Sequence, residues 1–93
     1  MINREEAARL YVDYIYERWD NIEEKFNRIF ERISADIEVK AKCGEKSVEE
    51  LVGVKVEDAK AIGEVLTDRY GYFVKVVDHG EGRTPEIIIR WRE

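Results

Sequence analysis

Apolar residues recur every three or four positions along the first third of the chain. From Asn3 to Ile33 there is neither Gly nor Pro, and this spacing predicts one long amphipathic helix over residues 3–33. Asn3, followed three residues later by Glu6, is typical of a helix start. The regular apolar positions are Ala8, Val12, Ile15, Trp19, Ile22, Phe26, Ile29 and Ile33.

A second interpretation has two helices that break at Asp20-Asn21, because Asp20 and Glu23 also form a capping signature. A turn would shift the phase of the apolar positions, and the phase runs through residues 19–22 unchanged. This continuity favours a single helix.

Such a helix would be about 45 Å long, whereas a compact domain of this size has a radius of gyration of about 13 Å. Part of its apolar side should therefore pack on the chain's own sheet and part on a second copy. The predicted oligomer interface comprises Ala8, Val12, Ile15, Trp19, Ile22, Phe26 and Ile29. Tyr11, Tyr14, Tyr16 and Trp19 surround the same helix and suit a protein interface, or else are divided between core and ordinary exposure.

The rest of the chain predicts a small α+β body. Residues 36–43 alternate strictly between polar and apolar, as in a half-buried strand. Residues 47–51 open with a capping box and predict a short helix or helical turn that ends at Gly53. Residues 57–70 predict a longer helix closed by Gly71. Residues 72–78 and 86–92 predict a hairpin.

These elements make one domain over residues 1–93, with a long helix at 1–34 and a body at 35–93. The expected order is α-β-α-α-β-β. The expected sheet has three strands, is mainly antiparallel, and carries the helices on one face.

The amino-acid composition argues against several classes of function. Sixteen basic and 21 acidic residues give a net charge of -5, which disfavours general nucleic-acid binding. One Cys and one His supply too few ligands for a zinc site, and we expect no metal and no cofactor. No apolar run reaches the length of a membrane span and no signal peptide is evident, so we expect a cytoplasmic protein without membrane contact.

Few residues could carry catalysis. Cys43 and His79 are the only possible nucleophile and base of that type, and each is predicted at the end of a strand without an orienting partner. Gly80-x-Gly82 lacks the third glycine and the following helix of a dinucleotide fingerprint. We therefore expect no enzyme activity.

The outward face of the predicted sheet is a candidate site for an anion or a nucleotide. Its members would be Lys40, Lys42, Lys75, Arg90, Arg92 and Phe73. Cations pair with phosphate and an aromatic ring can stack on a base. The alternative is a solvated face with cross-strand ion pairs.

The body also resembles small proteins of tailed bacteriophages. The residues concerned are Leu66 before Gly71-Tyr72-x-Val74, and a last strand that ends Ile87-x-Ile89-x-Trp91. The resemblance covers residues 34–92 and omits the long helix. It implies a phage or mobile-element origin, without catalytic residues.

The leading hypothesis is a self-associating, non-enzymatic protein that binds a host protein, in the manner of an inhibitor or anti-defence protein. One alternative is a sponge that binds a nucleotide or small anion on the basic face. Another is a virion or assembly component, for which oligomerisation is the whole function.

Overall fold

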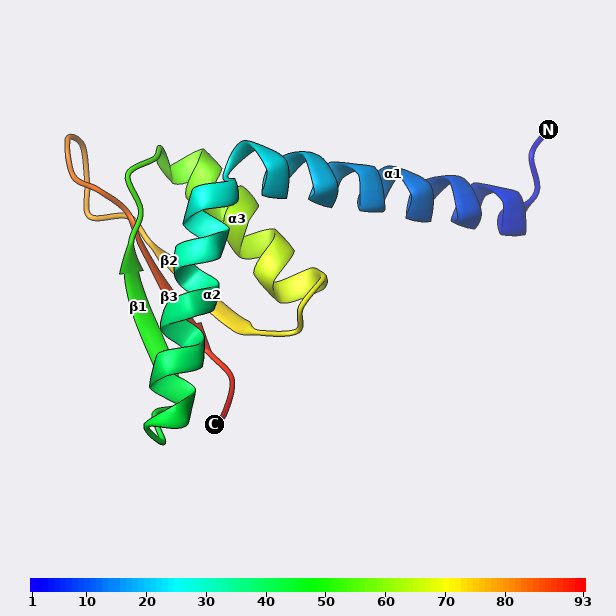
Figure 1. Ribbon diagram of the computed structural model, residues 1–93. Coiled ribbons are helices and arrows are strands. Elements are labelled where there is room, and N and C mark those ends of the chain that lie inside the picture. The colour runs from blue at the N-terminus through cyan, green and yellow to red at the C-terminus, as the bar shows by residue number, and fades with distance from the viewer.

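The computed structural model describes residues 1–93 as three helices and three strands (Figure 1). In chain order these are α1 (Arg4–Lys25), α2 (Asn27–Lys42), β1 (Ser47–Leu51), α3 (Val56–Asp68), β2 (Phe73–Val77) and β3 (Glu86–Arg90). The strands form one antiparallel sheet in the order β1-β3-β2, and α2 and α3 lie on the same face of it. The predicted α+β class and three-stranded antiparallel sheet are confirmed, although the order of elements is α-α-β-α-β-β.

The long N-terminal helix is confirmed, but it bends at a position that neither interpretation of the sequence anticipated. Asn3 caps it as predicted, since its Oδ1 accepts a hydrogen bond of 2.9 Å from the Glu6 N–H. The backbone leaves helical geometry at Phe26 (φ -113°, ψ 32°), where α1 ends and α2 begins. An unbroken helix to residue 33 and a break at Asp20-Asn21 are therefore both wrong. The bend contains no Gly or Pro, and the side chain of Phe26 packs against the core there.

Residues 36–43, predicted as a strand, are helical and form the end of α2. Ile29, Ile33 and Ile37 follow one another at intervals of four and pack on or within the hydrophobic core. The alternating pattern was misleading, because apolar residues at every second position also include pairs four residues apart, such as Ile33 and Ile37, which lie on one side of a helix. Val39, which the strand interpretation placed inward, is 61% exposed.

A glycine ends α2. Gly44 adopts φ 80°, a conformation that residues with a Cβ rarely adopt. The Gly44 N–H bonds to the Ala41 carbonyl and the Glu45 N–H to the Lys40 carbonyl, each at 3.0 Å. These paired bonds satisfy the last carbonyls of the helix in a Schellman motif.

Residues 47–51, predicted as a short helix, form strand β1. Val48 and Glu50 point inward and are buried, so the proposed capping box of Ser47 and Glu50 does not form. Pairing with β1 satisfies the second edge of β3, whose Ile87 and Ile89 are completely buried. A central strand without this neighbour would leave its backbone donors and acceptors unpaired.

From residue 56 onward, the elements agree with prediction to within two residues at each boundary. The inner side of α3 buries Ala59, Ile62, Val65 and Leu66, whereas Tyr70, just beyond the end of the helix, is 53% exposed. Gly71 closes the helix with φ 78°. In the hairpin, Val74 pairs with Ile89 and Val76 with Ile87 on the inner face.

The core lies between the sheet and the two helices that cover it. Its fully buried members include Ile33 from α2, Ile62 from α3, and Ile87 and Ile89 from β3. Burial of each such side chain contributes about 1.5–3 kcal/mol. None of the helices combines the length and the apolar character that a membrane span requires.

The molecule is L-shaped because α1 projects from the body (Figure 1). Its principal extents are 51 × 34 × 23 Å and its radius of gyration is 15.3 Å, against about 12–13 Å for a compact chain of this length. Only α2 and α3 contact α1. The N-terminal part of α1, residues 4–17, is called the arm below.

Candidate functional site

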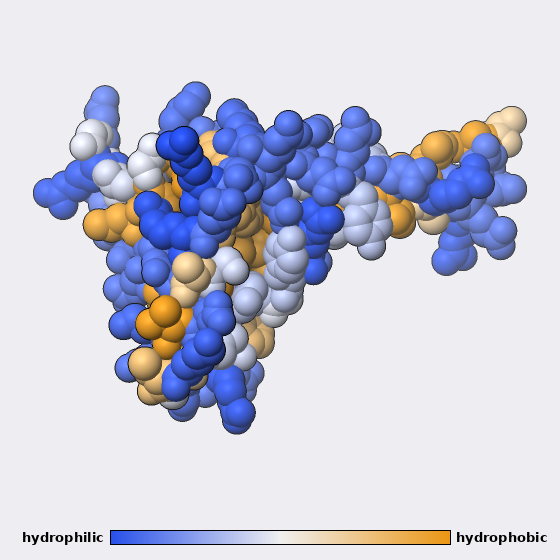
Figure 2. All heavy atoms as spheres, viewed as in Figure 1, coloured by the Kyte–Doolittle hydropathy of each residue, from blue (hydrophilic) through white to orange (hydrophobic).

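The arm exposes apolar and aromatic side chains with nothing of its own chain to cover them. The large ones, each 46–64% exposed, are Leu10, Tyr11, Val12, Tyr14 and Tyr16. At 3.6 residues per turn, the apolar positions of the arm cover about two-thirds of its circumference. Figure 2 shows hydrophobic atoms along the arm out to its end. A surface of this kind is typical of a protein interface.

Charged contacts hold the base of α1 against α3. The Arg18 guanidinium bonds to both carboxylate oxygens of Glu64, from Nε at 2.8 Å and from Nη2 at 3.1 Å. Arg69 lies 2.9 Å from Asp20 and 3.5 Å from Glu23. The hydrogen bond to Glu64 raises the pKa of Arg18, and the hydrogen bond to Asp20 raises the pKa of Arg69. These bonds fix the direction in which the arm leaves the body.

The structure divides the predicted oligomer interface into two parts. Ala8 and Val12, on the arm, are exposed, and Ile15 and Trp19 are half-buried near its base. The remaining members are covered by the same chain, since Ile22 is buried and Phe26 and Ile29 pack against the core. Only the first part is therefore open to a second molecule.

A groove lies between α2 and the end of α3. No Cα atom of α2 comes within 8 Å of a Cα atom of α3, because α2 packs over β1 and α3 over β2. The space left is an open groove of about 500 Å³. It is lined mainly by apolar side chains, among them Phe30, Ile33 and Ile37 on one side and Leu66, Tyr70 and Tyr72 on the other.

Carboxylates accompany the apolar lining of this groove. Glu23, Glu31 and Glu38 line it, and no Lys or Arg does. Oε1 of Glu23 is buried without a hydrogen-bond partner. Interaction with Glu23, together with burial, raises the pKa of the Tyr70 hydroxyl. Glu23 and Glu38 are already paired within the chain, with Arg69 and Lys42, which leaves Glu31 as the lining carboxylate without an ion pair.

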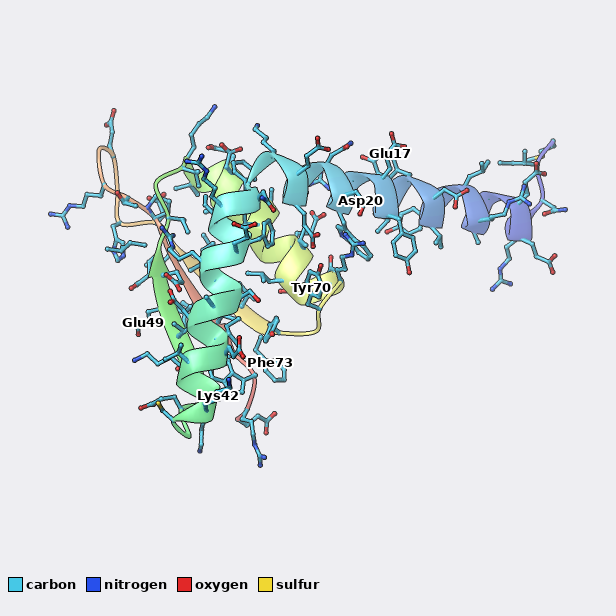
Figure 3. All side chains as sticks on the ribbon, in the orientation of Figure 1. Glu17, Asp20, Lys42, Glu49, Tyr70 and Phe73 are labelled. Carbon is cyan, nitrogen blue, oxygen red and sulfur yellow. The ribbon has the colours of Figure 1, made fainter.

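The candidate basic face is not assembled as predicted. Lys40 and Lys42 belong to α2 rather than to a strand, and Lys42 pairs with Glu38 at 2.9 Å. Phe73 and Arg90 do oppose each other on the outer face of the sheet, with Lys75 two residues on. Figure 3 shows Lys42 on the end of α2 and Phe73 at the start of β2.

Acidic residues share the outer face of the sheet with Lys75 and Arg90 and offset their positive charge. Glu49 of β1 and Lys75 of β2 both pair with Ile88 of the central strand, so the two charges share one row of the sheet. Glu86 also belongs to the outer face. Arg92 lies exposed beyond the end of β3. This mixture of acidic and basic side chains on one face is typical of a solvated sheet face.

The possible catalytic residues do not converge. Cys43 is exposed at the end of α2, near the Ser47 end of the sheet. His79 follows the opposite end, and its Nε2 lies 3.5 Å from Oε1 of Glu86. No group of three or more His, Cys, Asp and Glu side chains is arranged to hold a metal ion.

One buried carboxylate was missed by the sequence analysis. Glu50 is 7% exposed on the inner face of β1, where its Oε1 has no partner. Burial and a hydrogen bond with Asp36 raise its pKa to about 7, while the charge of Arg32 acts in the opposite direction. Because Glu50 lines no pocket described above, we assign it to the packing of α2 on β1 rather than to chemistry.

The groove too was missed, because it exists only if residues 36–43 are helical. Its sequence signal is the continuation of the isoleucine spacing from Ile29 and Ile33 to Ile37, followed by Gly44 as a helix stop. Comparison with known proteins adds no further assignment. No family model, no curated protein and no solved structure matches this chain.

Proposed function

We propose that this chain is a small, non-enzymatic binding protein that self-associates through its N-terminal helix and acts by holding a partner protein. The observation that supports this most directly is the arm, whose large apolar side chains have no cover within the molecule. The bacteriophage resemblance of the body makes a host protein the expected partner, and inhibition the expected consequence of binding.

The length of the arm supports the proposal as well. Fourteen residues of isolated helix are marginal in water, because nucleation is costly and few hydrogen bonds follow it. The arm has a side-chain cap at Asn3, but beyond its base it has no packing partner in the body. A protein contact would supply the missing tertiary stabilisation.

Light scattering coupled to size exclusion, over a range of concentrations, tests the self-association. We expect the wild-type chain to exceed its monomer mass of 11.0 kDa and Leu10→Asp to remain monomeric. Glu6→Asp is the matched control, since it places the same side chain on a charged side of the arm and should leave the mass unchanged. A wild-type monomer at high concentration would refute the proposal.

A pull-down from bacterial lysate with mass-spectrometric identification tests the partner. The bait is the wild-type chain, and Leu10→Asp is the comparison. Enrichment of one host protein by the wild type and not by the variant would support a partner held by the arm. Identical recoveries with the two baits would contradict it.

A further inference from the structure

We propose that the free edge of β2 binds an extended segment of a partner protein, which adds to the sheet as a fourth strand. This β2 edge consists of the main-chain groups of Val74 and Val76 that face away from β3. It lies apart from the arm, since α1 makes no contact with β2, so the inference does not rest on self-association. Extended segments bind sheet edges through main-chain hydrogen bonds, and the neighbouring side chains select the sequence.

The hydrogen bonds at the two ends of β1 show which residues of the central strand face β2. The Trp91 N–H bonds to the Lys46 carbonyl and the Val52 N–H to the Pro85 carbonyl, each at 3.1 Å. Both bonds continue the register in which β1 pairs with β3. Alternate residues of an antiparallel strand direct their main-chain groups to opposite sides. The odd-numbered residues of β3 therefore bond to β1, and the even-numbered residues bond to β2.

The same alternation leaves two residues of β2 without a main-chain partner. Phe73, Lys75 and Val77 pair with the even-numbered residues of β3, so Val74 and Val76 direct their N–H and C=O groups to the other side. No strand pairs with β2 there, and no backbone bond outside the helices and strands involves either valine. Only α3 and β3 contact β2. Two donors and two acceptors are thus free to receive a further strand.

The opposite edge of the sheet, on β1, is protected. Leu51 faces that edge, and its carbonyl already accepts a hydrogen bond of 3.1 Å from Nη2 of Arg32. β1 also carries Glu50 buried on its inner face, and inward-pointing charged residues protect edge strands from pairing. The single charged residue of β2, Lys75, lies instead on the outer face. The β2 edge is therefore the one that is open to a partner.

A second copy of this chain does not fit the β2 edge. Gly63 of α3 lies over β2, since a Cβ there would be 3.2 Å from Cγ2 of Val76 and 3.3 Å from Cγ1 of Val74. Two β2 strands paired about a two-fold axis would lie about 4.8 Å apart, with both α3 helices on one face, whereas packed helices need about 8–10 Å. The β1 strand of a second copy carries α2 and meets the same obstacle. The added strand must therefore come from another protein and have no helix over it.

The side chains beside the edge indicate the chemistry of that segment. Phe73 is 56% exposed on the outer face, and Lys75 and Arg90 are exposed on the same face. Neither Lys75 nor Arg90 forms an ion pair within the chain. Cross-strand pairing favours an apolar residue opposite Phe73 and an acidic residue opposite Lys75. In an antiparallel partner strand this is the pattern acidic-x-apolar.

A capped peptide of sequence Thr-Val-Glu-Val-Phe-Thr-Ser is the probe for this site. Aligned antiparallel to β2, it places its Glu opposite Lys75, its Phe opposite Phe73, and its two valines opposite Val76 and Val74. Calorimetry should show saturable one-to-one binding. Amide exchange measured by NMR should slow at Val74 and Val76, because their N–H groups become bonded. Absence of saturable binding up to about 1 mM peptide would overturn the proposal.

Methylated peptides test whether the main chain carries the contact. N-methylation of both valines removes the N–H groups that would bond to β2, so it should abolish binding. N-methylation of the Glu and the Phe is the matched control, because their N–H groups point away from β2, and saturable binding should persist. Equal binding by the two methylated peptides would mean that side chains alone hold the peptide, which overturns the added strand.

A charge exchange tests the alignment of the segment. Lys75→Glu should weaken binding of the peptide by about three- to tenfold, and replacing the Glu of the peptide by Lys should restore it. Lys40→Glu is the matched control, since Lys40 is exposed on α2, and the affinity should not change. If Lys75→Glu bound both peptides as the wild type does, the proposed partner chemistry would be wrong.

The arm provides a last control. Leu10→Asp should bind the peptide as tightly as the wild type, because α1 does not contact β2. Loss of peptide binding in this variant would place the site on the arm and overturn the inference. Failure of the peptide to bind would leave the proposed self-association intact, because that is measured separately from the mass of the wild-type chain.

Discussion

Arg18 of α1 and Glu64 of α3, 46 positions apart in the chain, form two parallel hydrogen bonds of 2.8 and 3.1 Å. This contact lies where the arm leaves the body, and it orients the helix that we assign to self-association. A bidentate pair of this kind is geometrically more restrictive than a single ion pair.

Replacement of this arginine should loosen the arm more than it destabilises the body. Arg18→Ala should lower the free energy of unfolding by only about 0.5–1 kcal/mol, because both side chains are partly exposed to solvent. Amide hydrogen exchange in residues 4–25 should accelerate while exchange in β3 stays slow. Arg9→Ala, on the exposed arm, is the control. Equal exchange in the two variants would show that the pair does not hold α1.

The bend at Phe26 should depend on the packing of its ring. Phe26→Ala removes a half-buried aromatic side chain that contacts the core, and it should cost about 1–3 kcal/mol in urea unfolding. Phe73→Ala deletes the same atoms from a ring that is 56% exposed on the outer face of the sheet, and it should cost less. Similar losses in the two variants would argue against tertiary packing as the cause of the bend.

Gly63 allows α3 to approach β2 closely. A Cβ at this position would lie 3.2 Å from Cγ2 of Val76 and 3.3 Å from Cγ1 of Val74. Gly63→Val should therefore destabilise the fold by about 2 kcal/mol or more through overpacking. Gly53→Val provides the comparison, since no atom lies within 4 Å of a Cβ there. Thermal unfolding measures both, and equal melting temperatures would contradict the close approach.

Glu50 should make the fold less stable as the pH rises. Its pKa is about 7 in the folded chain and about 4.3 when unfolded. Between these values the folded chain holds a proton that the unfolded chain has lost, so the free energy of unfolding falls with rising pH. The stabilisation is fully present below about pH 4.3 and is lost by about pH 7.

Glu50→Gln should flatten this dependence and raise stability at pH 8 by about 1 kcal/mol. Urea unfolding at pH 5 and pH 8 measures the effect. Glu49→Gln, at an exposed position on the opposite face of the same strand, should keep the wild-type slope. An unchanged slope in Glu50→Gln would assign the pH dependence to other groups.

The sequence by itself determined the elements whose signals are local. Asn3 and Glu6 start the first helix, Gly71 ends α3, and the β-rich segments around residues 79–85 form the hairpin. Each of these features depends on contacts among residues close together in the sequence, so the pattern along the chain is sufficient to predict it. The α+β class follows from these elements.

Only the tertiary structure decided whether residues 36–43 and 47–51 form helices or strands. The alternation in 36–43 fits a strand or a helix, and only the packing of Ile33 and Ile37 against the core selects the helix. Ser47 and Glu50 fit a helix cap, but their segment instead pairs with the otherwise unpaired edge of β3 and forms β1. The groove follows from both outcomes, and its only sequence signal is the isoleucine spacing that continues from Ile33 to Ile37 before Gly44. The exposed arm was anticipated from the length of the apolar helix, whereas its division at Phe26 depends on which apolar residues the body can cover.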